Sequence, residues 1–185
     1  YYFSVTASPA IRILHLYDQK SEANYINKLY QNDSLFSFQS VNVNNIDVSK
    51  MESYDLVVLE GLRSYSSNRA TAARSFINNG GSLGIIPAQR LDSVSLSSFV
   101  SPFGIRLSAI NNTAIEPLKI QSPDVRNPFY SDVFEQINLP GNVDLPAMKP
   151  MLRWEGIGET LLKFANEQRF LSFTRVGNGG LYLFS

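Results

Sequence analysis

Two apolar runs separated by a polar helical stretch constrain the fold more than any other part of the chain. Residues 54–60 (Tyr-Asp-Leu-Val-Val-Leu-Glu) are almost continuously apolar, which is typical of a strand covered on both faces. A helix predicted from Ser66 or Ser67 follows, and Gly80 is placed to end it in a left-handed conformation. Residues 82–86 form the second apolar run, which Pro87 ends. This order predicts a strand–helix–strand unit of a parallel sheet.

Apolar runs elsewhere extend this unit. Further parallel strands are predicted at 11–17 and 35–43, joined by a helix from Ser21 to Tyr30. Helical spacing predicts which side chains of the two long helices face the core: Ala23, Ile26, Leu29 and Tyr30 in the first, and Ala70, Ala73, Phe76 and Ile77 in the second.

Shorter segments follow in the second half of the chain. The predicted elements are a short helix at 93–100, strands at 105–107 and 114–120 with a turn at 111–112, a short helix at 130–137, an ordered stretch rich in Pro and Gly at 138–150, and strands at 160–164, 170–175 and 181–184. We therefore expect residues 1–185 to form a single α/β domain. Its predicted fold class is a flavodoxin-like three-layer sandwich with an antiparallel β extension at the C-terminal end.

Composition excludes several classes of function. The 16 basic and 16 acidic residues give a net charge of zero, which argues against nucleic acid or an anionic membrane surface as the main partner. The absence of cysteine excludes disulfides, thiolate zinc sites and a cysteine nucleophile. The acidic residues are scattered, so neither a metal nor a cofactor is expected. No apolar run approaches the roughly 18–20 residues of a membrane span.

The candidate functional residues follow the predicted parallel strands. Ligands of such sheets bind beyond the carboxyl ends of the strands. The polar side chains expected at that edge are Asp18, Glu60, Arg63, Gln89 and Arg90. They could line a ligand cleft, or they could make the loop hydrogen bonds and ion pairs that strand ends commonly carry.

The single histidine offers little evidence of catalysis. His15 lies between Leu14 and Leu16 in a predicted buried strand, so we expect a core or rim histidine with its polar needs satisfied. A general base would need an orienting carboxylate and a nucleophile nearby. No serine lies in a G-x-S-x-G elbow. Residues 177–180 (Gly-Asn-Gly-Gly) lack the lysine and the following helix of a phosphate loop, and they predict a hairpin turn.

Several segments occur in an order that points to one family. They are residues 2–5 followed by 11–14, residues 45–47 followed by 54–59, residues 76–83, residues 127–130 with 133–134, and the ending 179–185. In this order they resemble the class I glutamine amidotransferase-like domain of BatA-type (aerotolerance-related) membrane proteins of Bacteroidetes. The family's enzymes carry a cysteine nucleophile at a strand-to-helix elbow, with His and Glu after it. The corresponding strand end here is Pro87-Ala88-Gln89, and no histidine follows His15.

The resemblance therefore implies a degenerate frame without glutaminase chemistry. It implies a non-catalytic binding or assembly module of a bacterial cell-envelope protein, anchored in the inner membrane and displayed in the periplasm. The implied partners are other domains of the parent protein or other envelope proteins, with membrane contact only through segments outside residues 1–185.

Two alternative functions stay open. One is an enzyme with a carboxylate/arginine site made by Asp18, Glu60, Arg63 and Arg90 at the strand ends. The other is a sugar- or peptide-binding domain, in which Trp154 and the tyrosines would stack on a ligand, although a tryptophan in an apolar strand more often belongs to the core.

The two ends of the sequence suggest a longer protein. The chain begins at Tyr1 without an initiator methionine or a basic leader, and it ends inside the apolar run 180–185. We expect the parent protein to continue shortly afterwards into a membrane anchor. Residues 181–185 are expected to form a covered strand, folded back on 170–175 by the turn at 177–180.

Overall fold

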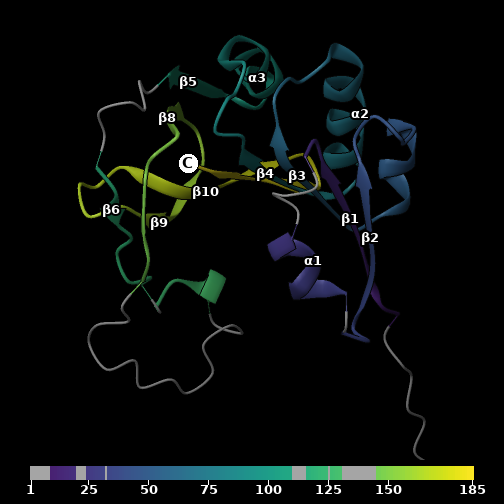
Figure 1. Cartoon of the computed structure of the whole chain (residues 1–185), viewed down its shortest axis with the longest axis horizontal. Helices are drawn as coiled ribbons and strands as arrows, with labels where there is room; N and C mark the ends of the chain where they lie inside the picture. Colours follow the sequence, from purple (N-terminus) through teal and green to yellow (C-terminus); the bar gives the residue numbers. More distant parts are fainter. Residues whose placement is uncertain (1–8, 20–23, 32, 110–115, 125, 131–144) are drawn as a thin grey trace, which may run out of the picture.

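A seven-stranded mixed sheet forms the centre of the computed structural model, which describes residues 9–19, 24–31, 33–109, 116–124, 126–130 and 145–185 (Figure 1). Five neighbouring strands are parallel and the last two are antiparallel. In spatial order the strands are β2 (Phe36–Asn42), β1 (Ile11–Tyr17), β3 (Leu56–Leu62), β4 (Ser82–Pro87), β11 (Gly179–Phe184), β10 (Arg169–Val176) and β9 (Glu159–Lys163).

The predicted parallel strands are confirmed. Segments 11–17, 35–43, 55–60 and 82–87 lie in one sheet as β1, β2, β3 and β4, and each pair of neighbours is parallel. The fold is an α/β fold of the flavodoxin type, with more strands than the sequence predicts. The terminal segment 181–185 also pairs as expected with 170–175, through a turn that contains Gly177 with a positive φ of 56°.

Helix α2 (Ser67–Asn78) covers one face of the sheet together with α3 (Ser93–Val100), as Figure 1 shows above the strands. Ser66 caps α2 by accepting a hydrogen bond from the amide of Arg69, 3.4 Å away. The amides of Gly80 and Gly81 donate to the carbonyls of Ile77 and Phe76, each over 3.0 Å. Gly80 takes a φ of 106°, so the predicted left-handed end of this helix is confirmed.

Helix α1 (Asn24–Tyr30) lies on the opposite face of the sheet (Figure 1). The Tyr30 ring packs on Phe36 and Phe38 of the edge strand β2, with ring centroids 5.0 and 5.7 Å away. The prediction that Leu29 faces the core is wrong, because its side chain is 65% exposed. This short helix meets the edge of the sheet along a narrow stripe, so Leu29 lies on its solvent side. Residues 20–23 lie outside the described residues.

The C-terminal half contains two small sheets that the sequence analysis did not anticipate. Strand β8 (Leu152–Gly156) pairs antiparallel with β5 (Ile105–Ala109). The sequence analysis missed β8, although buried Leu152 and Trp154 alternate with exposed Arg153 and Glu155. The remaining elements are β6 (Leu118–Lys119) paired with β7 (Ala147–Met148), and the 3-10 turns η1 (Val48–Ser53), η2 (Ser101–Phe103) and η4 (Pro128–Tyr130).

The segments predicted between residues 110 and 150 are only partly covered by the described structure. Among the described residues 116–120 of the predicted strand 114–120, Leu118 and Lys119 form a strand and Ile120 bridges to Phe164, while residues 114–115 lie outside the described residues. Only two residues pair there because the partner strand β7 is itself two residues long. The predicted turn at 111–112 and most of the predicted segments 130–137 and 138–150 lie outside the described residues.

The main core lies between the sheet and the layer formed by α2 and α3. Leu181 and Leu183 of β11 are fully buried in it, together with Leu83 and Ile85 of the neighbouring β4. A second, smaller core surrounds Phe164 on the antiparallel extension. Among the described residues, no helix is long and apolar enough to cross a membrane.

Truncating Leu183 tests the importance of β11. Because Leu183 is fully buried between two strands, we expect Leu183→Ala to lower the free energy of unfolding by about 2–5 kcal/mol in urea titrations. Leu35→Ala is the matched control, since Leu35 is 66% exposed, and its effect should stay within about 0.5 kcal/mol.

Deleting 181–185 should leave the protein aggregated or unfolded, whereas removing residues 1–4 should be milder. A deletion variant that stays monomeric and melts near the parent temperature would contradict the assignment.

An ion pair joins the start of β1 to the start of β3. The guanidinium of Arg12 donates to both oxygens of Asp55, over 2.7 and 3.2 Å, and the amide of Arg12 donates to the same carboxylate over 2.8 Å. The side-chain hydrogen bond from Arg12 is the main cause that lowers the pKa of Asp55 below its usual range. The contact fixes the register of two parallel strands that are 43 residues apart in sequence.

This ion pair predicts a pH dependence of stability. A carboxyl group whose pKa is lower in the folded state stabilises the fold above its unfolded pKa of about 3.9, and the contribution is lost as pH falls through the folded value. Asp55→Asn should therefore be less stable than the parent protein at pH 7, and the difference should shrink below about pH 4. Asp124→Asn is the control, because its partner Arg126 lies in the same loop. A constant difference from pH 7 to pH 2 would refute the assignment.

Candidate functional site

The polar residues predicted at the carboxyl ends of the parallel strands lie at one edge of the sheet, but they do not form one site. Glu60 and Gln89 line the same cavity. Asp18 and Arg63 form a pair of their own, with Oδ2 and Nε 3.8 Å apart and the Arg63 side chain 59% exposed. Arg90 is exposed in the loop after β4, outside the described lining of the cavity.

The cavity has a volume of about 800 Å³, which is within the range of small-molecule sites. Its floor is the end of β3 and β4, and part of its wall comes from β7 and the residues after it, far away in the sequence. The described lining consists of Tyr25, Glu60, Gly61, Ile86, Pro87, Gln89, Ala147, Met148, Lys149, Met151 and Ser185. Most of these side chains are apolar, so the few polar groups would decide which ligand is bound.

Glu60 is the unusual member of this lining, because it is a buried carboxylate. Its Oε2 lies 2.8 Å from Nε2 of His15, an ion-pair distance without the alignment of a hydrogen bond. The other ring nitrogen of His15, Nδ1, lies 3.0 Å from the hydroxyl of Ser40. Strand pairing places His15 between Ser40 and Glu60. His15 is directly opposite Ser40 on β2, and Glu60 of β3 is opposite Tyr17, two residues after His15 on the same strand.

A backbone irregularity follows Glu60 directly. Gly61 takes a φ of 65°, and the pairing of β3 with β4 shifts its register between Glu60 and Leu62. Such bulges re-aim the side chains beside them, and a positive φ favours glycine. Glu60 can therefore face the cavity while the rest of β3 remains buried.

Ser40, His15 and Glu60 are the residue types of a hydrolase triad, but their arrangement does not fit catalysis. A nucleophile must reach the substrate, and Ser40 lies on the edge strand β2, outside the described lining of the cavity. His15 itself is fully buried as expected, but only Nδ1 has a hydrogen-bonding contact, and Nε2 meets Glu60 without hydrogen-bond alignment, so the expectation of a satisfied histidine is met only in part. We conclude that His15 holds the carboxylate in place, with Ser40 fixing the ring.

Sequence reasoning missed this pair, although the sequence carried part of the signal. Alternation along β1 places His15 and Tyr17 on one face, and adjacent parallel strands place the end of β3 beside them. Tyr25 and Lys149 could not be found in this way, because they come from a helix and from a loop that only the tertiary structure brings to the cavity.

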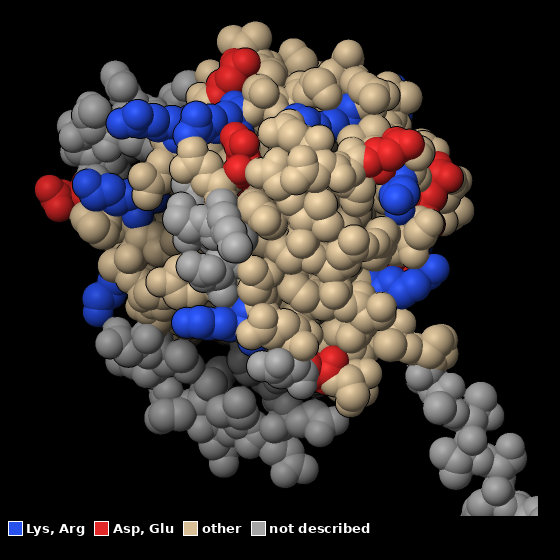
Figure 2. All heavy atoms as spheres, turned by 45° about the vertical axis from the view of Figure 1, so that its right-hand side comes forward, with Lys and Arg blue, Asp and Glu red and all other residues tan. Residues whose placement is uncertain are grey.

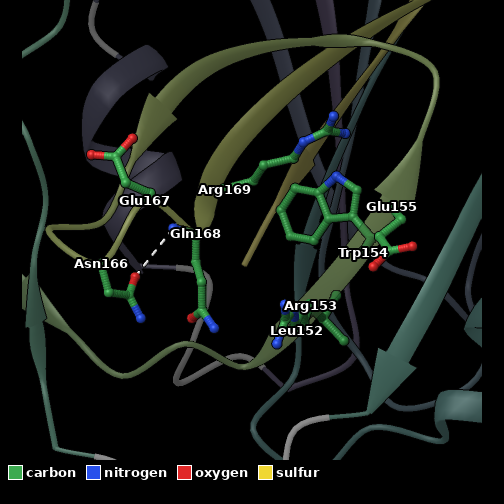
Figure 3. A pocket seen from close by; sticks show the side chains of 8 residues that line it. All are labelled: Leu152, Arg153, Trp154, Glu155, Asn166, Glu167, Gln168 and Arg169. Atoms are coloured by element: carbon green, nitrogen blue, oxygen red, sulfur yellow. Dashed lines mark hydrogen bonds between the residues drawn. The ribbon is translucent and has the colours of Figure 1, made fainter.

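A second hollow of about 330 Å³ lies between β8 and the turn from β9 to β10 (Figure 3). The backbone N–H of Gln168 donates to Oδ1 of Asn166 there, over 3.2 Å. Trp154 is 4% exposed and donates its indole N–H to Ser172 over 3.1 Å, so it belongs to the core and offers little surface for stacking. Across the described residues, no group of three His, Asp or Glu side chains could hold a metal ion.

The face drawn in Figure 2 carries no large patch of like charge among its described residues. Figure 2 shows Lys and Arg interspersed with Asp and Glu around the margin of one face, while the middle of that face is uncharged. The carboxyl-edge cavity, with its buried carboxylate, remains the most chemically distinctive feature of the described structure.

A double-mutant cycle measures the support that His15 gives to Glu60. His15→Phe leaves the buried carboxylate without its partner, so we expect the free energy of unfolding to fall by about 3 kcal/mol. The further change Glu60→Met should recover part of this loss, because it removes the unpaired charge. Ser40→Ala removes one hydrogen bond and should cost about 1 kcal/mol. Additive effects of His15→Phe and Glu60→Met in urea titrations would show that the two side chains are not coupled.

The comparisons with known proteins support the fold. The sequence matches no protein-family model and no curated protein. Among solved structures, a putative ThuA-like protein from Bacteroides uniformis matches with a TM-score of 0.66 at 16% identity, over 100% of this chain and 84% of that one. A glutamine amidotransferase from Thermotoga maritima matches with a TM-score of 0.55 at 12% identity, over 96% of this chain and 76% of that one.

A further similar structure is an exo-β-1,4-mannosidase from an Opitutaceae bacterium, with a TM-score of 0.62 at 12% identity. The match covers 94% of this chain but only 31% of the mannosidase, so this chain spans about a third of that enzyme. At these identities the comparisons show the fold alone. The chain has the α/β fold of class I glutamine amidotransferases and ThuA-like proteins.

Proposed function

We propose that this chain is a non-catalytic binding or assembly module, and that its ligand occupies the cavity at the carboxyl ends of β3 and β4. The observation that carries the proposal is the buried carboxylate of Glu60, held by His15 and facing a cavity of about 800 Å³. Burying a charge beside an apolar cavity is unfavourable, and such features cluster at functional sites.

The absence of a cysteine nucleophile supports binding over glutaminase catalysis. The enzymes that the sequence resembles use a cysteine at a strand-to-helix elbow, and this chain contains none. Its corresponding strand end is Pro87-Ala88-Gln89, followed by a short loop and α3. Ala88 is buried and has no reactive group, so glutaminase chemistry has no starting point there.

We further propose that the parent is a BatA-type protein of Bacteroidetes with this module in the periplasm. The support is the order of matching segments in the sequence, together with the amidotransferase-like fold. In this arrangement the module would bind other domains of its parent or other envelope proteins. Protease accessibility of the parent protein in spheroplasts, compared with intact cells, measures this placement.

The competing enzyme would use Asp18, Glu60, Arg63 and Arg90 together. Its geometric support is weaker, because Asp18 and Arg63 contact each other while Glu60 faces the cavity with Gln89. The sugar- or peptide-binding alternative has better support, since the cavity combines polar groups with the exposed ring of Tyr25.

An assay of turnover tests the non-catalytic reading. We expect the purified chain to release no ammonia from glutamine and to hydrolyse no p-nitrophenyl acetate above the buffer rate, because it has no cysteine nucleophile and Ser40 lies outside the described lining of the cavity. An active class I glutamine amidotransferase serves as the positive control. Turnover that Glu60→Ala or Arg90→Ala abolishes would overturn the proposal in favour of the enzyme.

A further inference from the structure

The cavity lining also indicates which chemical class of ligand it would take. We propose that the ligand is a neutral polyhydroxylated molecule of the sugar type, whose hydroxyl groups donate hydrogen bonds to Glu60 and whose ring rests on Tyr25. This inference depends on the proposed binding function, and it adds the ligand class and the role of each polar group.

The first step is the unused hydrogen-bonding capacity of Glu60. An ionised carboxylate accepts hydrogen bonds at about four positions and donates none. Within the described residues, its polar partner is His15, which lies against the buried oxygen Oε2, so a ligand in the cavity would bind the other oxygen, Oε1. A ligand in this cavity must therefore bring donors, which hydroxyl and ammonium groups can supply.

The second step separates a hydroxyl from an ammonium group. Lys149 lines the same cavity as Glu60, so a cationic ligand would be repelled by one and an anionic ligand by the other. Gln89 adds an amide that both donates and accepts. A hydroxyl group also does both, so a neutral polyol carries groups that match Glu60, Lys149 and Gln89 without bringing a like charge to either charged side chain.

The third step concerns the shape and polarity of the walls. Much of the wall is an apolar surface to which water can make no hydrogen bonds, formed by Ile86, Pro87, Met148 and Met151. A sugar ring presents C–H groups on its faces and hydroxyls around its perimeter. Tyr25 is 77% exposed on α1 and offers the kind of aromatic surface on which such a face packs.

The fourth step is the orientation of the carboxylate. His15 is fully buried and lies between Ser40 and Glu60, with contacts of 3.0 and 2.8 Å. The carboxylate is therefore held before a ligand arrives, and less conformational entropy is lost on binding. His15 acts here as a positioning residue, since it lies outside the described lining of the cavity.

Calorimetric titration of the whole chain tests the ligand class. The probes are glucose, galactose, mannose, cellobiose and lactose, compared with putrescine as a cation, glutamine as a zwitterion and citrate as an anion. We expect at least one sugar to bind and the charged probes to give no saturable heat. Glu60→Gln should weaken that sugar by about 10- to 100-fold, which corresponds to losing hydrogen bonds to a charged acceptor.

Two further variants keep the test decisive if Glu60→Gln fails to fold. Tyr25→Ala changes an exposed side chain and should weaken binding by about 3- to 10-fold. Asp18→Asn removes the same charge at the same edge of the sheet, outside the described lining, and should leave the affinity unchanged.

The outcomes separate the two proposals. Saturable binding of putrescine, glutamine or citrate in place of a sugar would overturn the ligand class while leaving the binding function standing. Binding of no probe would overturn the sugar assignment and count against the binding function as well. Sugar binding that Glu60→Gln and Tyr25→Ala leave unchanged would place the sugar elsewhere and refute this site.

Discussion

The pairing of β11 with two neighbours of opposite direction is the interaction on which the architecture depends. On one side β11 runs parallel to β4, and on the other it runs antiparallel to β10. The parallel half and the antiparallel extension are thereby one sheet, although they come from opposite ends of the chain. The buried side chains of Leu181 and Leu183 extend the main core across this junction, and α2 contacts β11 as well as β4. The end of the chain therefore lies in the middle of the molecule.

The parallel half could be predicted because its signals are local. Continuous apolar runs, Ser66 as a cap and Gly80 as a helix end all act within a few residues, and each is found as expected. Leu29 was misassigned because helical spacing shows which residues share a face but not whether a partner covers it. Strand β8 was missed because Pro150 closely precedes it, Gly156 ends it, and its partner β5 is more than forty residues away.

Only part of the candidate site could be predicted from the sequence, because the rest depends on tertiary contacts that leave no local signal. That the carboxyl ends of parallel strands meet at one edge is a general property of the fold, so Glu60 and Gln89 could be named in advance. The separation of Asp18 with Arg63 from that cavity depends on side-chain directions, which no local signal provides. The contact between His15 and Glu60 depends on the register of β1 against β3, and this register is a tertiary property.

The cavity is lined on one side by the ends of β3 and β4 and on the other by β7 and the residues after it, and these two parts differ in how freely they can be substituted. The floor belongs to β3 and β4, whose side chains also build the main core, so substitutions there disturb stability. The wall at Ala147, Met148 and Lys149 is exposed, with Ala147 and Met148 on the two-residue strand β7 and Lys149 in the loop that follows. It is separated by more than fifty residues from the strands that it faces. Substitutions can therefore change the wall while the sheet stays intact, so the ligand of the proposed site could change without loss of the fold.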